Sequence, residues 1–117
     1  MFSRSIIAIT AYVALASAAA LDVFVPKITS PTAATVWKSG TVETVTWDTS
    51  NAPVNISNKG SIVLSDDGFP MDTLATGFDL RSGSQAVNVP KNLAGTNYTI
   101  TLYGDSGNIS PKFRIVS

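Results

Sequence analysis

The carboxylates of the chain cluster only once, in the segment Asp66-Asp67-Gly68-Phe69-Pro70-Met71-Asp72. Oxygen-rich loops of this kind bind hard cations such as Ca²⁺, but the spacing does not match a twelve-residue calcium loop and the closing Glu is absent. Paired carboxylates hydrolyse glycosides only when they face each other across a substrate cleft, for which a domain of this size has little room. Because Asp-Asp-Gly is equally typical of a tight turn, we predict neither a metal site nor a catalytic pair here.

The chain contains no His and no Cys. Without His it lacks the commonest general base and the commonest metal ligand, and with them an ordinary Ser-His-Asp triad and the histidine-bound copper that cleaves polysaccharides oxidatively. Without Cys it lacks thiol nucleophiles, thiolate metal sites and disulfides. We therefore expect no enzyme activity, no catalytic residues, no cofactor and no bound metal.

Three aromatic residues, Trp37, Phe69 and Phe78, lie outside the clearest strand patterns of the sequence. Exposed aromatic rings bind sugars by stacking a flat apolar face on the C–H groups of a pyranose. Their alternative role is to close the open ends of the fold. The exposure of these rings distinguishes the two hypotheses, because a buried ring cannot bind a sugar.

Three Asn-x-Ser/Thr triplets begin at Asn55, Asn97 and Asn108. In a secreted chain such triplets accept N-linked glycans where they lie on exposed segments. Asn55 lies in a polar segment and Asn97 lies at the start of a predicted strand. Pro111 follows the third triplet and stiffens it, which disfavours Asn108.

The N-terminal segment, residues 1–20, has the pattern of a secretory signal peptide. Arg4 provides the positive charge, an apolar run extends from Ile6 to Ala16, and Ala18-Ala19-Ala20 is a small-residue cleavage site. The run is shorter than the roughly 20 apolar residues that span a bilayer. No signal for a lipid anchor is recognisable at the other end. We expect one mature domain, residues 21–117, secreted to the extracellular space or the cell wall.

The charges of the chain balance, with eight Lys and Arg residues and eight Asp and Glu residues. A near-neutral protein has no field that attracts nucleic acid or an anionic membrane. We expect neither as a partner.

Short β-type runs separated by turn signals follow the signal segment, at residues 23–25, 41–48, 61–65, 78–80, 85–89, 98–103 and 112–116. Several alternate between apolar and polar residues; Tyr98, Ile100 and Leu102, for example, share one face, whereas Thr99, Thr101 and Tyr103 share the other. One apolar face per strand is what an antiparallel sandwich buries. The sequence therefore predicts an all-β fold, a single immunoglobulin-like antiparallel β-sandwich of about seven strands, with Trp47 and Tyr98 in the core. A small barrel is the structural alternative.

Four elements in this order resemble a known family: Ile28-Thr29-Ser30-Pro31; Gly40 with Val45-Thr46-Trp47; Val89-Pro90 with Tyr98-Thr99-Ile100-Thr101-Leu102; and Ser110-Pro111 with Phe113 and Ile115. They are similar to the immunoglobulin-like N-terminal domain of fungal Ser/Thr-rich anchored surface proteins, the Kre/Knh type tied to yeast cell-wall β-1,6-glucan assembly. The resemblance covers residues 24–116. It implies an Ig-like fold and a place at the fungal wall, and it carries over no catalytic residue. We expect the domain here without the Ser/Thr-rich stalk and anchor that are common in the family.

Three hypotheses of function follow. The first is a non-enzymatic structural or assembly role in the glucan and mannoprotein matrix of the wall. The second is a carbohydrate-binding module for wall polysaccharide, with Trp37, Phe69 and Phe78 as its rings. The third is a secreted effector or signalling protein that binds another protein, whose signature is a large contiguous apolar patch.

Overall fold

A computed structural model describes residues 24–54, 56, 58–104 and 107–117. The signal peptide predicted for residues 1–20 lies outside them. The described part contains nine strands and one turn of 3-10 helix: β1 (Ile28–Ser30), β2 (Val36–Lys38), β3 (Val42–Trp47), β4 (Gly60–Asp66), β5 (Phe69–Phe78), η1 (Leu80–Ser82), β6 (Ser84–Asn88), β7 (Gly95–Tyr103), β8 (Gly107–Ile109) and β9 (Phe113–Val116).

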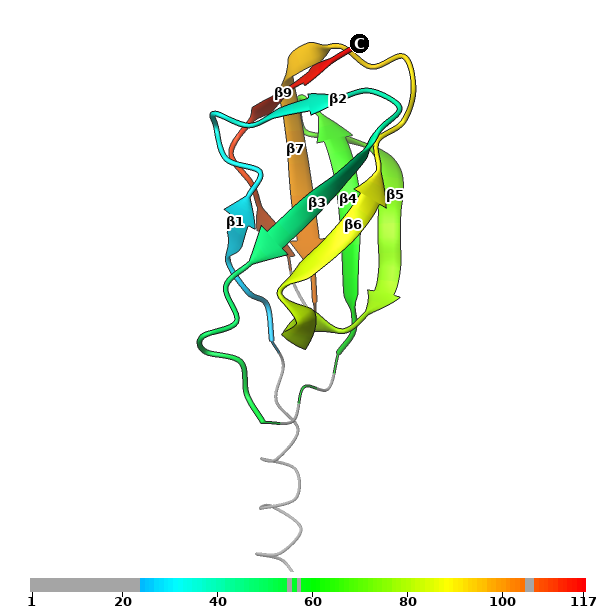
Figure 1. The fold of residues 1–117 in the computed structure, drawn as a ribbon. Coiled ribbons are helices and arrows are strands. Elements are labelled where there is room, and N and C mark those ends of the chain that lie inside the picture. The colour runs from blue at the N-terminus through cyan, green and yellow to red at the C-terminus, as the bar shows by residue number, and fades with distance from the viewer. Residues whose placement is uncertain (1–23, 55, 57, 105–106) are drawn as a thin grey trace, which may run out of the picture.

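The strands form two sheets packed face to face, as Figure 1 shows. The smaller sheet has the order β1-β3-β6, and the larger has the order β2-β9-β7-β4-β5, with β8 paired to β7. The prediction of an all-β sandwich is confirmed. Seven strand pairs connect the described strands, and all are antiparallel except β2 with β9, which is parallel and thus corrects the expectation of a wholly antiparallel fold.

The core lies between the sheets and consists of side chains that alternate inward along the strands. Opposite residues of neighbouring antiparallel strands point to the same face, so Ile62 with Leu102 and Leu64 with Ile100 are buried in pairs. The two predicted core aromatics, Trp47 and Tyr98, are both 4 % exposed. The buried apolar residues form one cluster: Phe24, Trp37, Val45, Trp47, Ile62, Leu64, Leu80, Val87, Val89, Tyr98, Ile100, Leu102, Phe113 and Ile115.

The N-terminal part of the domain differs from the prediction. Phe24 and Val25 are not in a strand, and the first strand is β1, three residues further along. Phe24 is nevertheless fixed, because its backbone N–H and C=O both bond the carboxamide of Asn58, each over 3.0 Å. The chain then leaves the smaller sheet and joins the larger as β2, beside β9 (Figure 1).

The last strand of the sandwich is divided at Pro111, which has no N–H to donate to a ladder. Before this point β8 pairs with the end of β7, and after it β9 pairs with the beginning of β7. Ser110 bridges this interruption with its side chain. Its buried hydroxyl accepts the N–H of Ile100 at 2.9 Å and donates to the carbonyl of Pro111 at 2.9 Å. The divided strand thereby stays attached along the whole of β7.

Candidate functional site

Trp37 is buried in the core, so its assignment to a sugar-binding surface is wrong. It is the middle residue of β2 and 2 % exposed. Its ring packs edge-on against Phe113, with centroids 4.8 Å apart and planes at 62°. The short parallel pairing of β2 with β9 turns this residue inward opposite Ile115, and no face of the ring is left for a ligand.

Phe78, at the end of β5, is half-buried and packs on the core. Its ring lies 5.5 Å from that of Trp47 and covers Gly60, where a Cβ would clash with it. Phe78 therefore closes one side of the sandwich, as the alternative hypothesis expected, and its packing gives no support to a role in sugar stacking. Phe69, at the other end of the same strand, is 74 % exposed. The predicted aromatic trio is thus reduced to one surface ring.

Tyr103 is an exposed aromatic residue that the predicted set did not include. It ends β7, is 43 % exposed, and pairs directly with Gly107 of β8. A Cβ built on Gly107 would lie 3.0 Å from Cε1 and 3.1 Å from Cδ1 of the tyrosine. The ring therefore leans across β8 over the space that the glycine leaves free. The alternation of β7 placed Tyr103 on the solvent face; the glycine beneath it is visible only once the β7–β8 pairing is known.

Tyr103 belongs to the outer face of the larger sheet, and we call the part of this face on β4, β5, β7 and β8 the hydroxyl face. On β9 and β2 the outer face carries the cationic residues Arg114 and Lys38. The hydroxyl face continues along β7 with Thr101 and Thr99, which pair with Val63 and Ser65 of β4. On the flanking strands it includes Ile109 of β8, and Thr73 and Thr76 of β5. None of its members bears a formal charge: Ser61, Val63, Ser65, Thr73, Thr76, Thr99, Thr101, Tyr103, Gly107 and Ile109.

The three hydroxyl residues in the centre of this face are largely covered by their neighbours. Ser65, Thr99 and Thr101 are 7–9 % exposed and make no side-chain hydrogen bond to another described residue. No buried side-chain polar atom in the described part of the chain lacks a partner, so these oxygens reach the surface. Ser61 and Thr76 bond each other across β4 and β5 at 3.2 Å.

The three predicted glycosylation sites differ in accessibility. Asn97 is exposed at the β4–β5 turn end of the hydroxyl face, where its backbone carbonyl accepts the N–H of Asp67. Asn108 is half-buried, and its Nδ2 donates to the carbonyls of Val25 and Pro26 at 3.0 and 2.7 Å. A glycan on that nitrogen would displace one of these bonds. Asn55 lies outside the described residues.

The acidic segment 66–72 is not one loop. Asp67 and Gly68 form the turn between β4 and β5, and residues 69–72 belong to β5. Asp67 and Gly68 have φ of 50° and 85°, the left-handed pair that a two-residue hairpin turn requires. Asp67 is exposed and forms an ion pair with Lys112 at 3.5 Å. Across the described ranges, no three acidic side chains gather as metal ligands.

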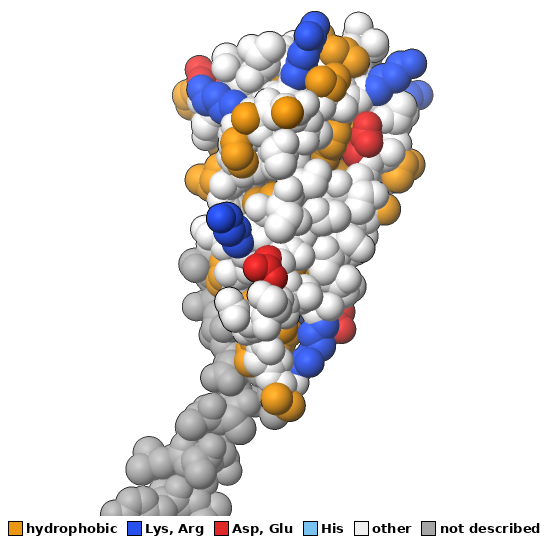
Figure 2. Space-filling model, turned by 60° about the vertical axis from the view of Figure 1, so that its left-hand side comes forward, with side chains coloured by type: hydrophobic (Ala, Val, Ile, Leu, Met, Phe, Trp, Pro, Cys, Tyr) orange, Lys and Arg blue, Asp and Glu red, His pale blue; other side chains and the backbone are white. Residues whose placement is uncertain are grey.

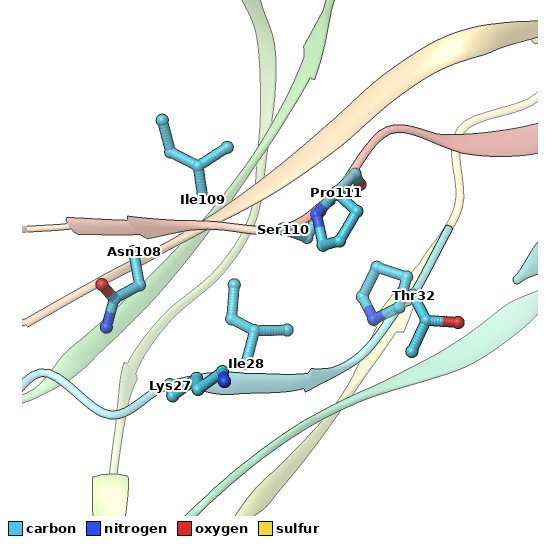
Figure 3. A pocket seen from close by; sticks show the side chains of 8 residues that line it. Lys27, Ile28, Thr32, Asn108, Ile109, Ser110 and Pro111 are labelled. Carbon is cyan, nitrogen blue, oxygen red and sulfur yellow. Dashed lines mark hydrogen bonds between the residues drawn. The ribbon is translucent and has the colours of Figure 1, made fainter. Parts of the chain in front are cut away.

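A shallow groove lies between β1 and β8 (Figure 3). It measures about 670 Å³ and is lined by Lys27, Ile28, Pro31, Thr32, Asn108, Ile109, Ser110 and Pro111. Ile28 points towards the segment 108–111, whereas Ile109 points to its far side. The hydroxyl of Ser110 and the carboxamide of Asn108 are already engaged with the backbone, so the polar groups of the groove serve the fold.

The surface over this edge is mixed. Figure 2 shows small groups of hydrophobic side chains among uncharged polar ones, with single Lys or Arg and Asp or Glu residues between them. One carboxyl near the groove is perturbed: the N–H and hydroxyl of Ser50 lower the pKa of Asp48, burial slightly opposes this, and Lys27 adds to the lowering. In the segments that the structure describes, no helix has the length and hydropathy needed to cross a membrane.

Comparison with known proteins places the chain in a family. A search of curated proteins and a search of solved structures each found no match. A family model, the Kre9/KNH-like N-terminal Ig-like domain, matches residues 30–115, which include every strand from β2 to β8 and most of β9. The family is associated with proteins of the yeast cell wall. This match agrees with the two-sheet sandwich and with the resemblance of the sequence motifs, and the chain belongs to the Kre9/KNH-like N-terminal Ig-like domain family.

Proposed function

We propose that this protein is a secreted, non-enzymatic component of the fungal cell wall with a structural or assembly role in its glucan and mannoprotein matrix. The family match over residues 30–115 carries this proposal, because it extends over nearly the whole sandwich. The signal-like pattern of residues 1–20 supports export. The balanced charge of the chain suits a matrix of neutral polymers, in which a protein is held by contact and not by ion exchange.

Binding of wall polysaccharide is the second candidate function, and the hydroxyl face gives it specific support. For the alternative that the protein binds another protein, the described surface gives no such support. The expected signature of that alternative is a large contiguous apolar patch, but the exposed large hydrophobic residues are distributed over five strands and one loop: Val36, Val42, Val54, Phe69, Met71, Tyr103 and Ile109.

The proposed function can be tested by fractionation. The full chain with a C-terminal tag is expressed in a fungal host, and the protein is quantified in the medium, in a detergent extract of the walls and in the residue that glucanase releases. We expect a substantial fraction in the wall and its release by glucanase. Spheroplasts without walls are the control and should release the protein to the medium. Complete recovery from the medium of intact cells would refute the proposal.

A further inference from the structure

The ring of Tyr103 is held over β8 and is partly open to solvent. Its Cδ1–Cε1 edge lies over Gly107. A larger residue at position 107 would displace the ring, because its Cβ would clash with this edge and would also lie 2.9 Å from Cγ2 of Thr101. The contact at this edge fixes the position of the ring over β8, and 43 % of the residue is exposed. An exposed, positioned aromatic ring can stack on the C–H face of a sugar.

Hydroxyl groups of the neighbouring strands lie in register beside this ring. Ser61 and Thr76 lie in the same row across the strands as Tyr103, and Thr101 and Thr73 lie in the next row. Neighbouring strands are about 4.8 Å apart and alternate residues about 6.6 Å, so three rows over four strands cover about 14 Å by 13 Å. If one sugar unit of a polymer lies on Tyr103, the next units would therefore lie over the hydroxyl donors and acceptors of β7 and β4.

The chemistry of this face selects one class of ligand. A nucleic acid or an anionic polymer requires cationic side chains where it binds. None of the ten residues of the hydroxyl face is charged, and the cationic residues Arg114 and Lys38 of the outer face lie beyond β7, on β9 and β2. The centre of a stable protein interface is mostly apolar and aromatic, whereas Ser65, Thr99 and Thr101 occupy the centre here. Hydroxyls around a single aromatic ring match a neutral carbohydrate.

From these observations we propose that the hydroxyl face is a binding surface for a neutral polysaccharide chain, with Tyr103 as the stacking residue. This inference rests on the proposed function, because the wall supplies such a ligand. The surface is open at its sides and not a closed pocket, so the polymer lies along it and is recognised within the chain and not at its end. The hydroxyls provide the lateral contacts.

The test is depletion of the purified protein from solution by insoluble β-1,6-glucan, β-1,3-glucan and chitin. We expect saturable binding to at least one polymer. Tyr103→Ala should weaken it by about tenfold or more, as truncation of a central aromatic contact does, and Tyr103→Phe should retain it. Gly107→Ala should weaken binding while keeping the ring, because the added Cβ displaces it. Phe69→Ala removes an aromatic residue that is 74 % exposed but off the face, and should have no effect.

A second measurement does not depend on any variant. Backbone NMR shifts of the wild-type protein, recorded with soluble oligosaccharides of the polymer that binds, should change along β4, β7 and β8 and not along β1 and β3. Equal depletion of wild type and Tyr103→Ala, or shifts confined to the smaller sheet, would overturn the inference. Failure of all three polymers to bind would overturn it too, yet would leave the proposed function intact if the protein still fractionates with walls.

Discussion

At the scale of single residues, Trp47 joins the two sheets in two ways. Its buried ring packs against Phe78, and its indole N–H donates to the carbonyl of Leu80 at 2.7 Å. The first contact fills the core and the second fixes η1 on the side of the sandwich. The residue thus links β3 of the smaller sheet to the end of β5 in the larger one.

Replacement of Trp47 should therefore have a large effect on the free energy of unfolding. We expect Trp47→Ala to lower it by about 3–5 kcal/mol, as large-to-small core changes do, which is close to the whole stability of a small domain. Trp47→Phe should lower it less, but by at least about 1 kcal/mol, because it leaves the Leu80 carbonyl without its donor. Urea unfolding followed by far-UV circular dichroism measures both. Phe69→Ala is the exposed control, expected within about 0.5 kcal/mol of wild type. Equal urea midpoints for Trp47→Ala and wild type would contradict the assignment of Trp47 to the core.

The carboxamide of Asn108 has a structural role that Asn97 lacks. Because Asn108 donates to two backbone carbonyls, we expect secretion from a fungal host to yield glycans on Asn97 and none on Asn108. Asn97→Gln should then lower the mass of the intact protein by one glycan. Asn108→Gln should leave the mass almost unchanged but reduce the melting temperature, since two half-buried carbonyls lose their donor. Intact-mass spectrometry before and after glycan removal shows which of the two residues carries a glycan. A glycan on Asn108 would disprove the hydrogen-bonding role of its carboxamide.

At the scale of elements, the divided last strand depends on one hydroxyl. Ser110→Ala leaves the buried N–H of Ile100 unpaired in the central strand of the larger sheet. An unsatisfied buried donor costs about 1–3 kcal/mol, so we expect a loss of this size in urea unfolding. Hydrogen exchange should also accelerate at Ile100 more than at Leu64, its neighbour on β4. Ser84→Ala, at an exposed strand position, is the matched control. Equal stabilities of the two variants would show that the Ser110 hydroxyl does not stabilise the divided strand.

The elements that the sequence predicts are those with one buried face. β3, β4, β6, β7 and β9 alternate between apolar and polar residues because the opposite sheet covers every second side chain. β5 was missed because it is an edge strand whose first five residues are all exposed, so burial imposes no period on it. β1 and β2 are three residues long, which is too short for any period to show, and Pro26 and Pro31 lie on either side of β1.

Only part of the candidate site is predictable from the sequence, because the pattern within one strand does not show which strands lie beside it. Alternation in β7 predicts Thr99, Thr101 and Tyr103 on the face away from the core. Of these only Tyr103 is exposed, whereas Thr99 and Thr101 are 9 % and 8 % exposed. Which residues surround them depends on the pairing of β7 with β4 and β8, which joins segments up to about 40 residues apart. Trp37 was misassigned because only its pairing with β9 shows which way it points.

At the scale of the whole molecule, the absence of His leaves no side chain with an ordinary pKa near 6.5. The pKa of Asp48 is lowered by the N–H and hydroxyl of Ser50 and by Lys27, against a small opposing effect of burial. A carboxyl whose pKa is lower in the folded state stabilises the fold above its unfolded pKa of about 3.9, and this contribution is lost as the pH falls through the folded value.

The melting temperature should therefore be nearly constant from about pH 5.5 to 8 and should fall below about pH 4. Asp48→Asn should flatten part of the fall at low pH and leave the neutral range unchanged, because the amide does not titrate. Differential scanning calorimetry in buffers of equal ionic strength measures both curves. Lys112→Gln, which breaks an ion pair between two exposed side chains, is the control for general loss of charge and should change the melting temperature little. A step in melting temperature between pH 6 and 7.5 would contradict this account, because no side chain of ordinary pKa titrates there.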